Sequence, residues 1–269
     1  MSDVLSDLIA EQQALDEVVA RLSSEQWALP TPSPRWSIAD QIAHLTYFDG
    51  TAALAVADED AFNDSMGALV GAMTSDDPTV ADDATIGNLR RLPPEELLAR
   101  WRSNREALAA VAATLADDAR VAWYGPSMGA KSFLTARLME VWAHGQDVID
   151  ALAEAGIDVD RPATDRIRHI AQLGFITRGW TYVNRELDAP TTPVRVELTS
   201  PSGDTWSFGP DDAPESITGP ALDFCLVTTQ RRHVDDTDLV VSGEAARDWM
   251  EKAQLFAGPP TDGPPRRSE

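Results

Sequence analysis

The spacing of apolar residues changes once along the chain, and this change limits the folds open to it. From residue 3 to about residue 187, long stretches place apolar side chains three and four positions apart, the pattern of amphipathic helices. After DAPTTP, the stretch VRVELTS alternates by twos, PSGD is typical of a turn, and TWSFG and ESITG predict two more short strands. We therefore expect a mostly α fold followed by a small α+β domain.

The predicted elements divide the chain into three parts. A helical domain is expected over 1–188, a small α+β domain over 189–258, and a disordered proline-rich tail over 259–269. Long helices are predicted at 3–22, 37–57, 93–115, 132–154 and 162–187, and the last part adds a helix in PALDFCLVTTQRR, a strand in DLVVSG and a helix in EAARDWMEKAQLF. We expect a loop over 117–132. Residues 51–89 hold eight acidic and no basic side chains, so a solvated insertion with short helices at most is expected there.

Charge and cysteine content exclude several classes of protein. The formal net charge is -22, which repels nucleic acid and anionic membrane surfaces. The single cysteine, Cys225, excludes an internal disulfide and a thiolate metal cluster. No window approaches the roughly 18 apolar residues of a membrane span, and the N-terminus lacks the pattern of a signal peptide. We expect a cytoplasmic protein that binds neither nucleic acid nor membranes.

A carboxylate and an imidazole interrupt the apolar pattern of the helix predicted at 132–154. Glu140 and His144 lie four positions apart, within about 40° of each other around a helix, so both can approach one metal ion. Such a pair also arises by chance as a weak surface interaction. A catalytic zinc needs about three protein ligands, and His44, at the edge of an apolar helix face, is the best third candidate. The alternative is that His44 is a hydrogen-bonded histidine in the core or at its boundary and binds no metal.

Other polar residues near these positions have less specific interpretations. Asp40 and Asp147 are candidates to orient a ligand imidazole, although solvated helix faces also explain them. His169 and His233 are each flanked by arginines and fit surface or interdomain positions. Trp123 and Tyr124 in AWYGPS either line the mouth of a site, as substrate-binding residues, or plug the end of the helical domain.

Two segments together resemble a known family. WSIADQIAHLTYFD (36–49) and ARLMEVWAHGQDVIDAL (136–152) resemble the helical domain of the mycothiol-dependent maleylpyruvate isomerase family, within the DinB-like superfamily. In that family, one histidine from the first segment and the Glu and His of an E-x-x-x-H helix bind a divalent metal, usually taken as zinc. The resemblance implies a DinB-like four-helix bundle, with His44, Glu140 and His144 as metal ligands.

The C-terminal part carries a weaker resemblance to the same family. SITGPALDFCLVTTQRR resembles its small domain, which is similar to sterol-carrier folds, and the resemblance implies a catalytic arginine at Arg231, with Arg232 as the alternative. An Arg-Arg pair at a helix C-terminus is also explained by the helix dipole. Some uncharacterised members of a subgroup carry the description "wyosine base formation" on this domain. One cysteine and a charge of -22 do not suit tRNA modification.

These features lead to three hypotheses about function. The first is a transferase or isomerase in which zinc, or another divalent metal such as nickel, activates mycothiol or a similar small thiol toward a small electrophilic substrate. The second is a metal-binding stress-response or ligand-binding protein without turnover. The third treats the Glu-His pair as a local ion pair and the helix stripes as the interface of a homodimer.

Overall fold

The computed structural model describes residues 2–73 and 77–267, and the chain forms two compact units. The first unit is Met1–Arg161 and the second is Pro162–Glu269. The boundary expected after residue 188 lies inside the second unit. Compactness does not test where an independently folding domain begins, so that boundary stays a prediction.

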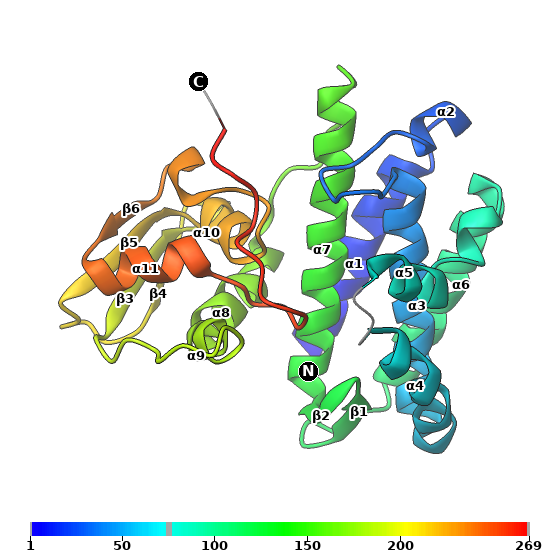
Figure 1. Ribbon diagram of the computed structural model, residues 1–269, viewed down its shortest axis with the longest axis horizontal. Coiled ribbons are helices and arrows are strands. Elements are labelled where there is room, and N and C mark those ends of the chain that lie inside the picture. Colours follow the sequence, from blue (N-terminus) through cyan, green and yellow to red (C-terminus); the bar gives the residue numbers. More distant parts are fainter. Residues whose placement is uncertain (1, 74–76, 268–269) are drawn as a thin grey trace. The chain divides into compact units, whose positions relative to one another are not determined.

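Four long helices form the centre of the first unit (Figure 1). They are α1 (Ser2–Val19), α3 (Ile38–Ala57), α6 (Pro94–Ala112) and α7 (Ala130–Glu154), and the short α2 (Ser24–Trp27) follows α1. Helix α3 packs against α6 and α7, and α1 packs against the same two helices. Their inward faces share one apolar core that includes Leu8, Leu15, Ile42, Leu45, Trp101, Leu108, Leu134 and Leu138. The hydrophobic periodicity predicted all four helices.

The start of α3 is fixed by a reciprocal pair of hydrogen bonds. The backbone N–H of Asp40 donates to the Ser37 hydroxyl at 3.3 Å, and the carboxylate of Asp40 accepts from the backbone N–H of Ser37 at 2.9 Å. This capping box satisfies two donors that the first turn of a helix leaves without partners. The helix predicted over 37–57 thus begins at this cap.

The acidic segment is more ordered than expected. We expected short helices at most over 51–89, and this is wrong for α4 (Glu59–Met73), which has 15 residues; α5 (Pro78–Thr85) and the single 3-10 turn η1 (Leu89–Arg91) follow. Phe62 and Leu69 are buried, whereas Asp60 and Asp64 are exposed. Helix α4 is therefore amphipathic, with buried apolar residues on one side and exposed acidic residues on another. Residues 74–76 lie outside the described part of the chain.

A short hairpin replaces the loop expected over 117–132. Strands β1 (Arg120–Trp123) and β2 (Gly125–Gly129) pair antiparallel, with Val121 opposite Met128. Glycine and proline in GPSMG conceal the strand signal, since both residue types are rare in strand interiors. The hairpin leads the chain directly into α7.

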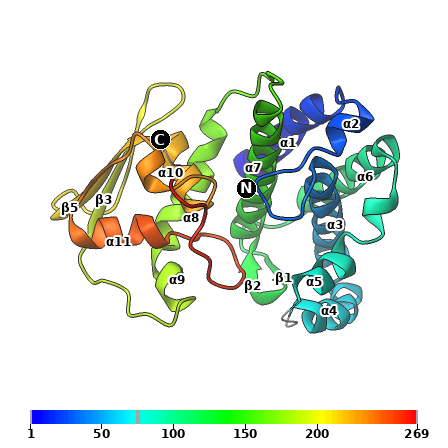
Figure 2. The same ribbon diagram turned by 45° about the horizontal axis from the view of Figure 1, so that its top comes forward.

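The second unit contains a four-stranded sheet with helices packed on it (Figure 2). Its strands are β3 (Val194–Thr199), β4 (Thr205–Phe208), β5 (Glu215–Pro220) and β6 (Val240–Ser242), in the order β4-β3-β5-β6, with β3 and β5 parallel. Alternate residues of β3 are buried, and α10 (Ala221–Thr228) and α11 (Glu244–Lys252) pack against the sheet. The 3-10 turn η3 (Val234–Asp236) precedes β6. The predicted strands and both helices are confirmed.

The long helix expected over 162–187 is broken. The chain forms a 3-10 turn, η2 (Asp165–Ile167), then α8 (Arg168–Ile176) and α9 (Arg178–Val183). Thr177 separates the two helices with ψ near 8°, and its hydroxyl donates to the carbonyl of Leu173 at 2.7 Å. Such side-chain bonding to the preceding turn bends helices, which apolar spacing alone does not indicate.

The tail that follows α11 makes hydrogen bonds within the second unit. Residues 253–267 carry no helix or strand, yet the Thr261 backbone N–H donates to Gln254 and the Arg267 backbone N–H donates to Asp236. Disorder of the tail stays a prediction.

Among the described residues, no helix combines the length and apolar character needed to cross a membrane.

One buried carboxylate binds side chains from the other three long helices. Asp49 of α3 forms an ion pair with Arg137 of α7 at 2.9 Å, and it accepts hydrogen bonds from Gln12 of α1 at 3.0 Å and from Trp101 of α6 at 3.1 Å. Asp49 is 1% exposed and Arg137 is 3% exposed. The pair is satisfied on both sides, which a buried ion pair requires.

Removing the Asp49 carboxylate should strongly destabilise the first unit. In Asp49→Ala, Arg137 would be left as a buried cation without its partner, so the free energy of unfolding should fall by about 3 to 5 kcal/mol. Urea unfolding followed by tryptophan fluorescence measures the change. The control Asp64→Ala, at an exposed position on α4, should change it by less than about 0.5 kcal/mol. Equal effects of the two substitutions would contradict this account.

Candidate metal centre

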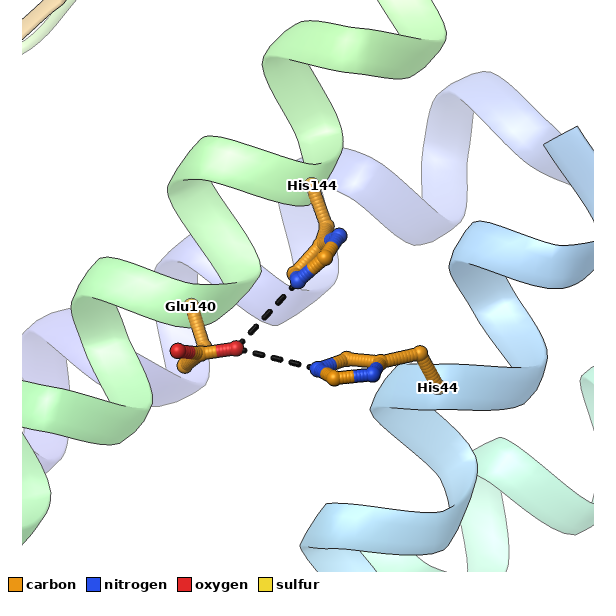
Figure 3. A group of neighbouring side chains, drawn as sticks. All are labelled: His44, Glu140 and His144. Carbon is orange, nitrogen blue, oxygen red and sulfur yellow. Dashed lines mark hydrogen bonds and ion pairs between the residues drawn. The ribbon is translucent and has the colours of Figure 1, made fainter. Parts of the chain in front are cut away.

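Two helices of the first unit bring the three predicted ligand residues together (Figure 3). His44 projects from α3, and Glu140 and His144 lie one turn apart on α7. Nε2 of His44 lies 3.0 Å from Oε2 of Glu140, and Nε2 of His144 lies 3.2 Å from the same oxygen. One possible ligand atom of each residue lies within 4.8 Å of the others. Within residues 2–73 and 77–267, no second trio of His, Cys, Asp or Glu meets this distance.

Aromatic rings surround the two imidazoles. The ring centroids of His44 and His144 are 4.2 Å apart, and Phe48 lies 4.5 Å from His44. Trp36 lies 5.3 Å from His44 and stacks on His144 at 5.9 Å. The side chains of His44, Glu140 and His144 nevertheless keep 17%, 24% and 12% of their surface exposed. The donors therefore sit in a largely apolar wall with a partial opening to solvent.

Burial and mutual contacts set the charges of this group. Burial, together with the nearby His144, lowers the pKa of His44 from 6.5 to about 4, although the hydrogen bond to Glu140 acts in the opposite direction. Burial alone would raise the pKa of Glu140, but its interactions with His144 and His44 outweigh burial and hold this pKa well below its usual value. At neutral pH, the site thus contains an ionised carboxylate and a neutral His44 imidazole.

The other ring nitrogen of His144 contacts a residue that the sequence did not single out. Nδ1 of His144 lies 2.5 Å from Oε1 of Gln41 and 3.9 Å from the carboxylate of Asp147, so Gln41 is its hydrogen-bond partner. Asp40 binds elsewhere, since it accepts from Ser37 and from Arg90 at 2.6 Å. The one available signal was the position of Gln41, three residues before His44 and therefore on the same helix face.

The rings of Trp123 and Tyr124 lie near Phe48, which in turn lies beside His44. The Trp123 ring stacks on Phe62 at 5.7 Å and meets Phe133 edge-on at 5.2 Å. Phe48 lies 6.4 Å from Trp123 and 5.7 Å from Tyr124. These contacts suit a plug at the end of the helices. A substrate-binding role for Trp123 and Tyr124 stays a prediction.

The remaining predicted residues belong to the second unit. Arg231 and Arg232 follow α10, where the backbone N–H of Arg231 donates to the carbonyl of Leu226 at 2.7 Å and closes the helix end. The Arg231 guanidinium donates to the carbonyl of Thr229 at 2.7 Å. His169 lies on α8, and Nδ1 of His233 accepts from the backbone of Asp235 at the start of η3. A catalytic role for Arg231 stays a prediction.

Comparison with models of protein families identifies the family of the chain. The model of the family described as "Mycothiol maleylpyruvate isomerase N-terminal domain" matches residues 8–149, which is more than half of the chain. The chain belongs to this family. The match covers α3 and most of α7, and therefore all three residues of the candidate centre. A second model, described as "Wyosine base formation", matches residues 190–242, from the start of the sheet to β6.

Individual relatives agree with the family match. Two uncharacterized proteins of Mycobacterium tuberculosis, from two strains, are each 46% identical over 259 residues, covering 96% of this chain and 97% of theirs. A crystal structure of the mycothiol-dependent maleylpyruvate isomerase has a TM-score of 0.56 at 16% identity, covering 90% of this chain and 92% of the other. A histidine-to-alanine mutant of that enzyme has a TM-score of 0.55 at 17% identity, covering 87% and 90%. These two structures show that the fold is shared.

The depressed pKa of His44 should make the metal-free protein less stable in mild acid. The unfolded chain binds a proton on this residue near pH 6.5, and the folded chain only near pH 4. Between these values the unfolded state holds more protons, so the free energy of unfolding should fall as the pH falls, by on the order of 3 kcal/mol. In His44→Asn, the free energy of unfolding should no longer show this dependence on pH.

The carboxylate of Glu140 does not explain a loss of stability that begins near pH 6.5. The depressed pKa of Glu140 stabilises the folded state above pH 4.5, and this stabilisation is lost only as the pH falls below that value. Denaturant unfolding at a series of pH values between 4 and 7 compares the two proteins. Parallel profiles for the wild type and His44→Asn would contradict the assignment.

Proposed function

We propose that the chain is a metal-dependent transferase or isomerase that activates a low-molecular-weight thiol such as mycothiol toward a small electrophilic substrate. His44, Glu140 and His144 hold the divalent metal, most simply zinc. One observation carries the proposal: the Nε2 atoms of two histidines from different helices point at the same carboxylate oxygen. Family membership supports it, because solved structures of similar fold bear the name of a mycothiol-dependent isomerase.

The donor set fits zinc in spacing and in charge. Zinc bonds of about 2.0 to 2.2 Å in a tetrahedron put neighbouring ligand atoms about 3.4 Å apart. The two nitrogen-to-oxygen separations, 3.0 and 3.2 Å, are close to that value. An ionised carboxylate and a neutral His44 imidazole are also the protonation states in which these side chains bind a metal ion. Three nitrogen and oxygen ligands are the set that catalytic zinc sites use, with a further position open.

The residues around the centre have separable roles in this proposal. A divalent metal, when bound, lowers the pKa of a thiol or water beside it. Trp36 and Phe48 limit the access of water to the donors, and the exposed fraction of Glu140 marks the side from which small molecules approach. Arg231 steadies an anionic substrate, and Trp123 and Tyr124 line the mouth.

The finer expectations about the fold belong to the same proposal. Helices α1, α3, α6 and α7 correspond to a DinB-like four-helix bundle, and the sheet of the second unit with α10 and α11 to a sterol-carrier-like domain. The buried thiol of Cys225 suits a reducing compartment, in keeping with the cytoplasm. A net charge of -22 argues against a nucleic-acid substrate, despite the wyosine description of the second family.

Metal analysis tests the first half of the proposal. Protein purified without chelators should carry one zinc per chain by elemental mass spectrometry, and His44→Ala or Glu140→Ala should carry less than a tenth of that, because two ligands bind zinc far more weakly than three. His233→Ala is the matched control and should retain the metal. Metal that persists in both ligand variants would leave only a local ion pair at this position.

Turnover tests the second half. The zinc-loaded protein should consume mycothiol with at least one member of a panel of small electrophiles, followed by loss of the free thiol. With an anionic electrophile, Arg231→Ala should lower kcat/KM by roughly 10- to 100-fold, the worth of one hydrogen bond between charged groups. Arg232→Ala should change it less than about twofold. Stoichiometric metal without thiol consumption would make the chain a binding protein instead.

A further inference from the structure

We propose that Gln41 and Thr31 form a hydrogen-bond relay that keeps a proton on Nδ1 of His144 and thereby makes Nε2 its metal-binding atom. Both are positioning residues, because they act through His144 and contact no substrate. The inference concerns residues outside the donor set and rests on the metal centre proposed above.

The relay runs from the loop before α3 to the metal centre in three contacts. The Thr31 hydroxyl lies 2.9 Å from the backbone carbonyl oxygen of Trp36. Nε2 of Gln41 lies 2.8 Å from the Thr31 hydroxyl, and Oε1 of the same amide lies 2.5 Å from Nδ1 of His144. The relay therefore joins the loop, α3 and α7.

The chemistry of the first contact sets the direction of the others. The Trp36 carbonyl can only accept, so the Thr31 hydroxyl must donate to it and has no second proton to give. Thr31 then accepts from the amide N–H of Gln41, and the amide oxygen of Gln41 faces His144. That oxygen can only accept, so Nδ1 of His144 must carry the proton. The opposite orientation of the amide would leave the oxygens of Thr31 and Trp36 2.9 Å apart with no proton between them.

Burial makes this arrangement hard to replace. Gln41 is completely buried, so water cannot supply a partner that its amide lacks. The loop end of the relay is also held, because the backbone N–H of Thr31 donates to the carbonyl of Trp36 at 2.8 Å, and Pro30 pairs with Ser37 as an isolated bridge. The loop from 30 to 37 is therefore part of the metal centre.

The fixed proton determines what can occupy the space beside Glu140. With the proton on Nδ1, a neutral imidazole has its lone pair on Nε2, the nitrogen that lies 3.2 Å from Oε2 of Glu140. The contact between these two atoms therefore needs either a proton on Nε2 or a cation between them. The relay thus favours a bound cation over a neutral Glu-His hydrogen bond, which would need the proton on Nε2.

The position of the proton can be observed without any metal. In metal-free protein at alkaline pH, long-range 1H–15N correlation spectra of the histidine ring should show a neutral His144 with its proton on Nδ1. In Thr31→Val and Gln41→Leu the ring should shift to a mixture of tautomers or to the Nε2–H form. Thr31→Ser keeps the hydroxyl and should retain the wild-type spectrum. A wild-type ring with its proton on Nε2 would overturn the relay.

Zinc affinity gives an independent readout. Competition with a chromophoric chelator should show zinc binding weakened by roughly 10- to 100-fold in Thr31→Val and Gln41→Leu, and restored in Thr31→Ser. If Gln41→Leu does not fold, the comparison of Thr31→Val with Thr31→Ser decides alone. Equal affinities of these two variants and the wild type overturn the relay. A wild type that binds no zinc but keeps the Nδ1 proton supports the relay and instead contradicts the proposed metal function.

Discussion

The buried carboxylate of Asp49 is the constraint on which the first unit depends. It accepts hydrogen bonds from α1, α6 and α7 while belonging to α3, so it fixes all four long helices against one another. Its partner Arg137 lies three residues before Glu140, and Asp49 itself lies five residues after His44. A charge pair that is costly to misplace thus sets the register of α3 against α7, about one turn from the candidate metal centre.

The candidate centre depends on that register because its donors come from both helices. A shift of either helix by one residue would turn His44 about 100° away from Glu140 and His144. The capping box at Ser37 fixes where α3 begins, and the relay through Gln41 fixes which nitrogen of His144 faces the carboxylate. Position, register and tautomer are therefore set by different contacts that all end at one site, as preorganised metal centres require.

Periodicity predicted the long helices and the strands of the second unit, because the apolar residues that one face buries recur at a regular spacing along the sequence. It did not predict α4, because the acidic residues of this segment suggested a solvated insertion, and it did not predict the break at Thr177 between α8 and α9. Spacing on α7 indicated Glu140 and His144. The position of His44 at the edge of an apolar helix face made it the third candidate, and the resemblance to a family implied the same residue. The position of Gln41, one turn before His44 on the same helix face, did not reveal its role, because its partners Thr31 and His144 are known only from the structure.

Anomalous diffraction at the zinc absorption edge tests the central claim most directly. Crystals of the zinc-loaded protein should show one peak in the first unit, about 2.0 to 2.2 Å from Nε2 of His44, Nε2 of His144 and a carboxylate oxygen of Glu140. The Nδ1 atom of His144 should remain in contact with Gln41. An ordered zinc ion bound elsewhere, or one that reaches His144 through Nδ1, would contradict the account.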